Sequence, residues 1–275
     1  MADERGDQNR SDTRTVGVDA SDIAEFYDAL SPYYHLIYQD WPASIERQGY
    51  QLDTLIRERW GARTREVLDA ACGIGTQTFA LAAHGYRMTS SDVSTAALDR
   101  ARDESRRRQH DIVFIEDDMR SLTKLAGQSF DLVIACDNAI PHLASDTEIR
   151  NTFQTFRDRL RPGGGCVISV RDYADLEREG TRLVPFGVRR DGDARFVVFQ
   201  VWEFDPAGYD LNFYFLEDRD GADPVTHVMR SRYHAVTTDR LVQLMREAGF
   251  EDVERIDARF FQPLIVGTRP GAGPL

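Results

Sequence analysis

A glycine-containing turn and an acidic residue beyond it are the parts of this 275-residue sequence best suited to bind a ligand. Residues 68–76 read Leu-Asp-Ala-Ala-Cys-Gly-Ile-Gly-Thr, an apolar strand pattern followed by Gly-x-Gly and the start of a helix. Glycines in such a turn allow a ligand to approach the bare backbone. Asp92 stands about 20 residues beyond Gly73, at the end of the next predicted strand, where a carboxylate can accept both hydroxyls of a ribose.

The same turn lacks one part of the dinucleotide-binding pattern. Gln77 and Thr78 stand in the region where the third glycine of Gly-x-Gly-x-x-Gly is found. That glycine allows close packing of the helix whose N-terminus faces a pyrophosphate. We therefore expect the ligand to be a nucleoside without phosphates.

The residues around this turn predict alternating strands and helices. Strands are expected at residues 66–70, 87–91, 111–115, 130–136 and 165–170, and helices at 76–84, 94–108 and 147–160. Ser94 is a natural cap for the second helix. Arg161-Pro162-Gly163-Gly164 is expected to end the third, because proline cannot continue a helix and glycine accepts the left-handed conformation. This order predicts an α/β protein with a doubly wound parallel sheet.

The flanking segments have different patterns. Residues 1–20 are polar and lack periodicity, so we expect a disordered leader. Residues 21–62 contain two aromatic-rich helices, the first split at Ser31-Pro32. Residues 173–234 are predicted to be an inserted antiparallel β meander attached to the sheet, with strands at 195–204, 209–217 and 225–234. The core then comprises residues 63–172 and 235–268, and its last part is expected to be a helix to residue 248 followed by two strands. Residues 269–275 are expected to form a loose tail.

The charge balance favours a small-molecule partner. With 34 Lys+Arg and 46 Asp+Glu the formal net charge is −12, whereas nucleic-acid binders usually collect positive charge. No apolar run approaches the roughly 18–20 residues of a membrane helix, and the first twenty residues lack the apolar region of a secretory signal. Three cysteines are too few and too far apart for a disulfide framework or a zinc site. We expect a cytoplasmic enzyme with no metal and no nucleic-acid or membrane partner.

Residues 69–76 resemble motif I of the class I S-adenosylmethionine-dependent methyltransferases. Segments similar to the rest of that series follow in order at 91–94, 117–122, 130–133 and 160–164. The resemblance implies a seven-stranded Rossmann-like methyltransferase sheet, S-adenosyl-L-methionine as cofactor and S-adenosyl-L-homocysteine as product. The helices of residues 21–62 would then form a lid, and residues 173–234 would cover the acceptor site.

The resemblance also implies roles for individual residues. Gly73 and its neighbours would flank the methionine part of the cofactor, Asp92 would bind the ribose, and Asp118 would accept the adenine amino group beside Met119. Asp69 would support the loop and the methionine amine, although by its position alone it could simply cap the turn. The complete cofactor-binding set expected is Tyr38, Arg47, Asp69, Ala71, Gly73, Gly75, Asp92, Val93, Asp118 and Met119.

A narrower resemblance is to the glycine and sarcosine N-methyltransferases. Residues 137–143, Asp-Asn-Ala-Ile-Pro-His-Leu, are similar to the Gly-Asn-Ser-Phe-Ala-His-Leu of that family, and 167–173 are similar to its fifth strand, whose arginine holds the substrate carboxylate. Residues 232–234 are similar to a tyrosine-containing strand near the end, and Tyr27, Tyr38 and Arg47 fall close to N-terminal aromatic and arginine positions. This implies methylation of the amine of a small carboxylate-bearing acceptor.

The sequence leaves two interpretations open for each of two arginines, Arg171 and Arg47. Arg171 is at the carboxyl end of a central strand, where ligands bind in open α/β sheets, and its two-pronged guanidinium suits a carboxylate. The alternative is an ordinary salt bridge to Asp172 or Asp175. Arg47 could clamp the methionine carboxylate of the cofactor or lie on a solvated helix face.

The remaining candidates are aromatic or polar. Tyr27 and Tyr38 could face the cationic sulfonium or form a core stripe, and Tyr214 and Tyr233 are candidates for the acceptor pocket. His142 could be a general base, but we favour a positioning role, with Asn138 presenting a carbonyl near the transferred methyl. The catalytic set expected is Tyr27, Asn138 and His142, acting in a direct in-line displacement whose rate comes from alignment in a water-poor site.

The acceptor and the assembly stay open. Residues 172–196 show little detailed similarity to the N-methyltransferases, so O- or C-methylation of a secondary metabolite is the alternative function. An RNA methyltransferase is disfavoured by the acidic balance and by the absence of an Asn-Pro-Pro-Tyr-like motif, and a non-catalytic cofactor-binding module would bind without turnover. The aromatic surfaces of the N-terminal helices and the meander could also be covered by a second copy in a homo-oligomer.

Overall fold

The computed structural model describes residues 20–174, 176, 178–206 and 208–271. The predicted leader falls outside this part of the chain except for Ala20, which already belongs to the first helix, α1 (Ala20–Leu30). Of the predicted tail, residues 272–275 also fall outside it. Among the described residues, no helix combines the length and the apolar character needed to cross a bilayer.

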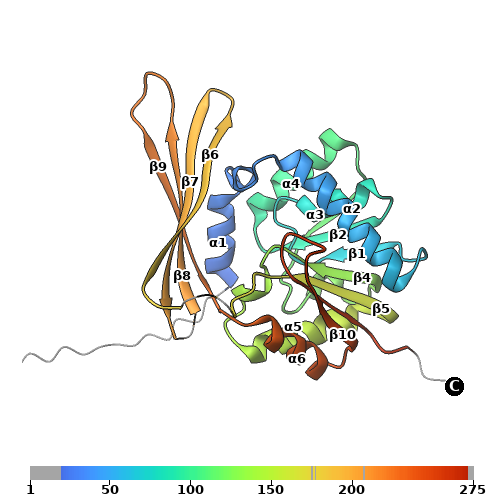
Figure 1. Cartoon of the computed structure of the whole chain (residues 1–275). Coiled ribbons are helices and arrows are strands. Elements are labelled where there is room, and N and C mark those ends of the chain that lie inside the picture. The colour runs from blue at the N-terminus through green and yellow to red at the C-terminus, as the bar shows by residue number, and fades with distance from the viewer. Residues whose placement is uncertain (1–19, 175, 177, 207, 272–275) are drawn as a thin grey trace, which may run out of the picture.

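A seven-stranded sheet forms the centre of the molecule (Figure 1), with strand order β10-β11-β5-β4-β1-β2-β3. Neighbouring strands among β1 to β5 run parallel, and β11 is antiparallel to both β5 and β10. The strands are β1 (Glu66–Asp69), β2 (Arg87–Asp92), β3 (Val113–Glu116), β4 (Phe130–Ala135), β5 (Leu160–Ser169), β10 (Glu251–Ile256) and β11 (Leu264–Thr268). This confirms the predicted fold class.

Helices cover both faces of this sheet. On β1, Leu68 belongs to the core that contains Phe153, whereas its neighbour Val67 packs in a second core with Leu52 and Ile56. Alternate side chains of a strand point to opposite faces, so each face has its own helical layer. The helices are α2 (Trp41–Trp60), α3 (Thr76–Ala83), α4 (Thr95–Arg108), α5 (Asp146–Arg159) and α6 (Thr238–Glu247), with short 3-10 turns η1 (Tyr34–Ile37), η2 (Thr123–Leu125) and η3 (Ile140–His142).

A second, antiparallel sheet stands apart from the first, with α1 between them (Figure 1). It consists of β6 (Thr181–Asp191), β7 (Ala194–Asp205), β8 (Gly208–Asp218) and β9 (Val225–Tyr233), paired in that order. The prediction of a three-stranded meander attached to the main sheet was therefore wrong in strand number and attachment. The missed strand, β6, is mostly exposed and carries Pro185 and Gly187 at a register shift, so its apolar alternation is weak.

The element boundaries follow local chemistry. Ser94 caps α4 by accepting from the backbone N–H of Ala97, and Thr237 caps α6 in the same way. The helix expected at 147–160 is observed as α5, which ends one residue earlier at Arg159, and Gly163 has a positive φ of 79°. The prediction missed that Leu160 is already extended and that the Pro-Gly-Gly residues belong to β5. The residue before a proline is disfavoured in the helical region, and this moves the end of the helix upstream.

Candidate functional site

Two cavities lie at the carboxyl ends of the parallel strands, next to α1. The first is narrow, about 50 Å³, and is lined by α1 and by the loops after β1, β2, β3 and β4. The second is much larger, about 500 Å³, and lies between the N-terminal helices, the ends of β4 and β5, and the second sheet. Tyr27, Tyr34 and Asp137 line both cavities, so the cavities meet at these three residues.

The structure brings most of the predicted residues to these cavities. Those lining the first are Tyr27, Ala71, Gly73, Asp92, Val93, Asp118, Met119 and His142. Those lining the second are Tyr27, Tyr38, Asn138, Arg171 and Tyr233. Arg47, Asp69, Gly75 and Tyr214 line neither of the two cavities.

The glycine turn is built around backbone groups of the first cavity. Gly73 has a positive φ of 52°, and a Cβ placed there would lie 3.2 Å from the ring of Tyr34. Its N–H donates to Asp92 Oδ2 at 2.7 Å, while Asp92 Oδ1 accepts from the N–H of Ser94 at 2.9 Å. Burial raises the pKa of Asp92. The turn and the carboxylate thus form one rigid cradle.

Asp69 and Gly75, two residues of the segment similar to motif I, support the first cavity from beneath and do not line it. Asp69 is buried and accepts a 2.7 Å hydrogen bond from the Thr78 hydroxyl, and burial raises its pKa to about 7. Gly75 has a φ of 92° at the start of α3, where a Cβ would overlap the ring of Phe79. Both residues fix the path of the chain from β1 into α3.

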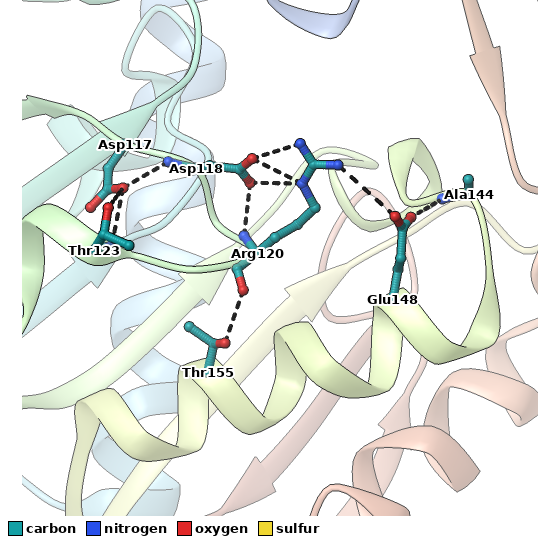
Figure 2. A network of polar contacts seen from close by, with 7 residues as sticks. All are labelled: Asp117, Asp118, Arg120, Thr123, Ala144, Glu148 and Thr155. Atoms are coloured by element: carbon teal, nitrogen blue, oxygen red, sulfur yellow. Dashed lines mark hydrogen bonds and ion pairs between the residues drawn. The ribbon is translucent and has the colours of Figure 1, made fainter. Parts of the chain in front are cut away.

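An acidic loop after β3 lines part of the first cavity, and Figure 2 shows its polar contacts. Asp117 accepts from the backbone N–H groups of Asp118, Thr123 and Lys124, so its carboxylate organises the loop. Asp118 is about a quarter exposed, and its carboxylate is paired with the guanidinium of Arg120 at 2.7 Å. A ligand amino group would therefore share the Asp118 carboxylate with that guanidinium.

A tyrosine and a histidine close the wall between the cavities. A 2.8 Å hydrogen bond joins Tyr27 Oη to His142 Nε2, and the imidazole lies 4.2 Å from the ring of Tyr233. Ser231 Oγ lies 3.4 Å from His142 Nδ1. Burial lowers the pKa of His142 to about 3, so the ring is neutral near pH 7. A neutral, fixed imidazole fits positioning better than proton transfer.

Arg171 is the charged group of the second cavity. Its Nη1 donates to Tyr209 Oη at 3.1 Å, and its Cζ lies 4.4 Å from the ring of Trp202. In the part of the chain that the structure describes, no carboxylate forms an ion pair with Arg171. Its neighbour Asp172 is paired with Arg255 at 2.7 Å. Asp175 lies outside the described residues. A cation held mainly by phenols and an indole face is suited to an anionic ligand.

A hydrogen-bonded network holds this arginine in place. Asn138 Oδ1 accepts from the backbone N–H of Arg171 at 3.0 Å, and Asn138 Nδ2 donates to Tyr173 Oη at 2.9 Å. Tyr173 Oη and Tyr209 Oη are 3.0 Å apart. Asn138, which we predicted to present a carbonyl near the transferred methyl, supports the Arg171 segment through these hydrogen bonds of its side chain.

Sequence reasoning overlooked several residues of the second cavity. Asp137 stands beside the predicted Asn138, and its position directly after a strand was the available signal. Phe186 and Phe213 come from a segment that matched no known pattern, so only its aromatic content marked it. Tyr209, which contacts Arg171 from the same segment, was overlooked for the same reason. Tyr214 was chosen in place of its neighbours, but it stacks on Phe199 at 4.8 Å, on the sheet face opposite to Phe213.

Arg47 has a simple environment. It is exposed on α2 and donates from Nη2 to Ser44 Oγ at 3.1 Å. Of its two interpretations, the position on a helix face describes what is observed. Tyr38, in contrast, reaches the second cavity and donates from its hydroxyl to Asp137 Oδ2 at 2.9 Å.

Comparison with known proteins agrees with this architecture. Residues 67–164 match the family described as "Methyltransferase domain". A glycine/sarcosine N-methyltransferase of Halorhodospira halochloris is 28% identical over 141 residues, covering 51% of this chain and 52% of that protein. A cypemycin N-terminal methyltransferase of a Streptomyces species is 33% identical over 129 residues, covering 46% of this chain and 51% of that protein. The chain thus spans about half the length of the curated relatives it matches.

A solved structure extends the fold similarity beyond the matched domain. The S-adenosylmethionine-bound CalS10, an amino pentose methyltransferase from Micromonospora echinaspora, superposes with a TM-score of 0.71 at 18% identity, covering 82% of this chain and 92% of that one. Residues 67–164 are therefore a methyltransferase domain, and the fold is one shared with an S-adenosylmethionine-bound methyltransferase of known structure. In sequence, about half of the chain is similar to glycine/sarcosine N-methyltransferases.

Proposed function

We propose that this protein transfers the methyl group of S-adenosylmethionine to the amine of a carboxylate-bearing small molecule. The single observation that carries the proposal is Arg171: a guanidinium without a carboxylate partner among the described residues, held in a 500 Å³ cavity that adjoins the cradle of Gly73 and Asp92. A carboxylate at Arg171 would place the rest of the acceptor towards Tyr27, Tyr34 and Asp137, where the two cavities meet.

The first cavity has the groups that the cofactor requires. Asp92 offers the carboxylate for a ribose, Gly73 the bare backbone, and Val93 and Met119 apolar surface beside a base. Ala20, Ile23 and Tyr27 of α1 line this cavity of about 50 Å³, so we expect α1 to shift outward when the cofactor enters. When bound, the cofactor supplies an electrophilic methyl group for direct in-line displacement.

The chain's own contribution is the alignment of acceptor and cofactor. Tyr27 and Tyr34 present aromatic faces at the junction, where they favour positive charge, and their ring centroids are 5.9 Å apart. His142 keeps Tyr27 in place through the 2.8 Å hydrogen bond. Holding nucleophile and methyl group in line converts a bimolecular step into an effectively unimolecular one.

The second cavity is larger than glycine or sarcosine needs. Its volume of about 500 Å³ is within the range of about 300–1,000 Å³ typical of drug-sized ligands. Apolar side chains, including Phe26, Leu211 and Phe213, form much of its wall. These features favour an amino acid with an apolar body. They also favour a second candidate, O- or C-methylation of a secondary metabolite.

The test is a panel assay with methyl-labelled S-adenosylmethionine. The panel contains glycine, sarcosine, amino acids with aromatic and branched side chains, short peptides, amino sugars, and phenols that lack an amine. We expect label in the larger amino acids or peptides. Transfer to no carboxylate-bearing amine would refute the proposal, and transfer to a phenol would support the second candidate.

A further inference from the structure

A carboxylate stands at the point where the two cavities meet. Asp137 follows β4, is half-buried, and lines both the first and the second cavity. Within the described residues, the Tyr38 hydroxyl is the one hydrogen-bond donor to its carboxylate, at 2.9 Å from Oδ2. Oδ1 therefore retains its capacity to accept hydrogen bonds from a ligand.

The backbone at this position is held in an unfavourable conformation. Asp137 has a φ of 56° and Asn138 a φ of 69°, both in the left-handed region that favours glycine. Two hydrogen bonds fix the pair: Asp137 N–H donates to Ser169 Oγ at 2.7 Å, and Asn138 N–H donates to Ser169 O at 3.0 Å. Strain retained in this way clusters at functional sites, because the surrounding structure must hold it.

The second cavity contains opposite charges that are not paired with each other. Arg171 and Asp137 both line it, and no ion pair joins them or any other carboxylate to Arg171 in the described part of the chain. Asp172 also lines the cavity, but its charge is matched by Arg255. An anion site and a cation site in one cavity are complementary to a zwitterion.

We propose that Asp137 binds the ammonium group of a zwitterionic acceptor and accepts its proton. This rests on the proposed N-methyltransferase function and names the substrate class of that site: an amino acid or peptide whose carboxylate binds at Arg171 and whose ammonium reaches the junction. When the proton moves to Asp137, an N–H bond breaks, its electron pair stays on nitrogen as the lone pair, and the carboxylate oxygen gains the proton. Water in the open cavity then takes the proton from Asp137.

The other groups facing Asp137 leave it as the proton acceptor. Burial raises the pKa of the phenols of Tyr27, Tyr34 and Tyr38 and of the thiol of Cys136, so all four stay neutral. Arg171 stays charged. Burial, with a smaller opposing effect of Tyr38 and Arg171, raises the pKa of Asp137 itself, which makes it a better proton acceptor than an exposed carboxylate.

The experiment compares the wild type with Asp137→Asn, which adopts the left-handed conformation readily and still accepts from Tyr38. The matched control is Asp193→Asn, at an exposed carboxylate in the turn between β6 and β7. The kcat/KM for the acceptor found by the panel assay is measured from pH 7 to 10. Calorimetry at pH 7.5 gives the Kd of S-adenosylmethionine and of S-adenosylhomocysteine, which lacks the sulfonium charge.

We expect Asp137→Asn to lower kcat/KM on the order of 100-fold at pH 7, and the loss to shrink about tenfold per pH unit as the free amine becomes available. Both cofactor Kd values should change by less than about threefold, and Asp193→Asn should behave as the wild type. A wild type that transfers to no carboxylate-bearing amine refutes the proposed function, and this inference with it.

Two other results overturn only the inference. One is a variant that keeps wild-type kcat/KM across the pH range while the wild type methylates an amino acid. The other is a variant whose pH profile parallels that of the wild type and which binds S-adenosylmethionine, but not S-adenosylhomocysteine, more weakly. That second result would assign the carboxylate to the cofactor's sulfonium.

Discussion

The first cavity is lined mostly by loops that each follow a strand of the seven-stranded sheet, whereas the second also draws on all four strands of the second sheet and on residues 261–263. In the first, backbone N–H groups of Gly73 and Ser94 fix the Asp92 carboxylate. In the second, Arg171 is held by side chains such as Tyr209 and Trp202 from the other sheet. The cofactor end is therefore determined by local backbone geometry, and the acceptor end by tertiary packing of side chains.

This difference explains what the sequence could predict. Gly73 and Asp92 were found because a βα turn and the next strand end are close in sequence and their spacing is dictated by the fold. Tyr173 and Tyr209 could not be found in this way, since their hydrogen bond depends on how the second sheet docks. Arg171 could be predicted from the sequence because it stands at the end of a strand of the main sheet. Tyr214 shows the limit: a one-residue difference decides which face of a strand a side chain occupies.

The largest expected effect is at Arg171. Removing a half-buried, charged donor from a bound carboxylate costs about 2–5 kcal/mol, so Arg171→Ala should lower kcat/KM for the acceptor about 30- to 5,000-fold. The Kd of S-adenosylmethionine should stay near the wild-type value, which separates the two cavities. Arg182→Ala is the control, because this exposed arginine lies over the same Trp202 ring, at 5.8 Å. Steady-state kinetics with intact turnover in Arg171→Ala would instead favour the second candidate function.

The free energy of unfolding should depend on pH through Asp69, which lies beneath the cofactor cavity. Burial raises the pKa of Asp69 to about 7, so between about pH 4 and pH 7 the folded chain binds a proton that the unfolded chain has released. The free energy of unfolding should therefore fall as the pH rises through this window. Asp69→Asn should flatten that decline by up to about 1 kcal/mol per pH unit, as measured by urea unfolding at intervals from pH 4 to 8. An unchanged slope would contradict the raised pKa.

The size of the acceptor cavity can be tested from its apolar wall. Phe186 and Phe213 pack with ring centroids 5.3 Å apart, and both line the cavity. Phe186→Trp should reduce the volume and lower kcat/KM about tenfold for an aromatic or branched amino acid, with little effect on glycine or sarcosine. Phe199→Trp, on the opposite face of the same sheet, is the control. Equal loss for small and large acceptors would show that the wall does not select size.

The smallest effect should appear at the junction itself, as a gain in stability. Asp137 combines a positive φ with a carboxylate whose pKa burial raises, and both features cost folding free energy above about pH 5. Asp137→Asn should therefore unfold with a free energy about 1 kcal/mol higher at pH 8, and the gain should shrink as the pH falls towards 4 and the wild-type carboxyl becomes protonated. Urea unfolding of this variant, with Asp193→Asn as the reference, measures it. If Asp137 served packing alone, its replacement should lower the free energy of unfolding. A variant that is more stable and turns over slowly would identify strain maintained for function. A less stable variant would place Asp137 with the structural residues of the second cavity.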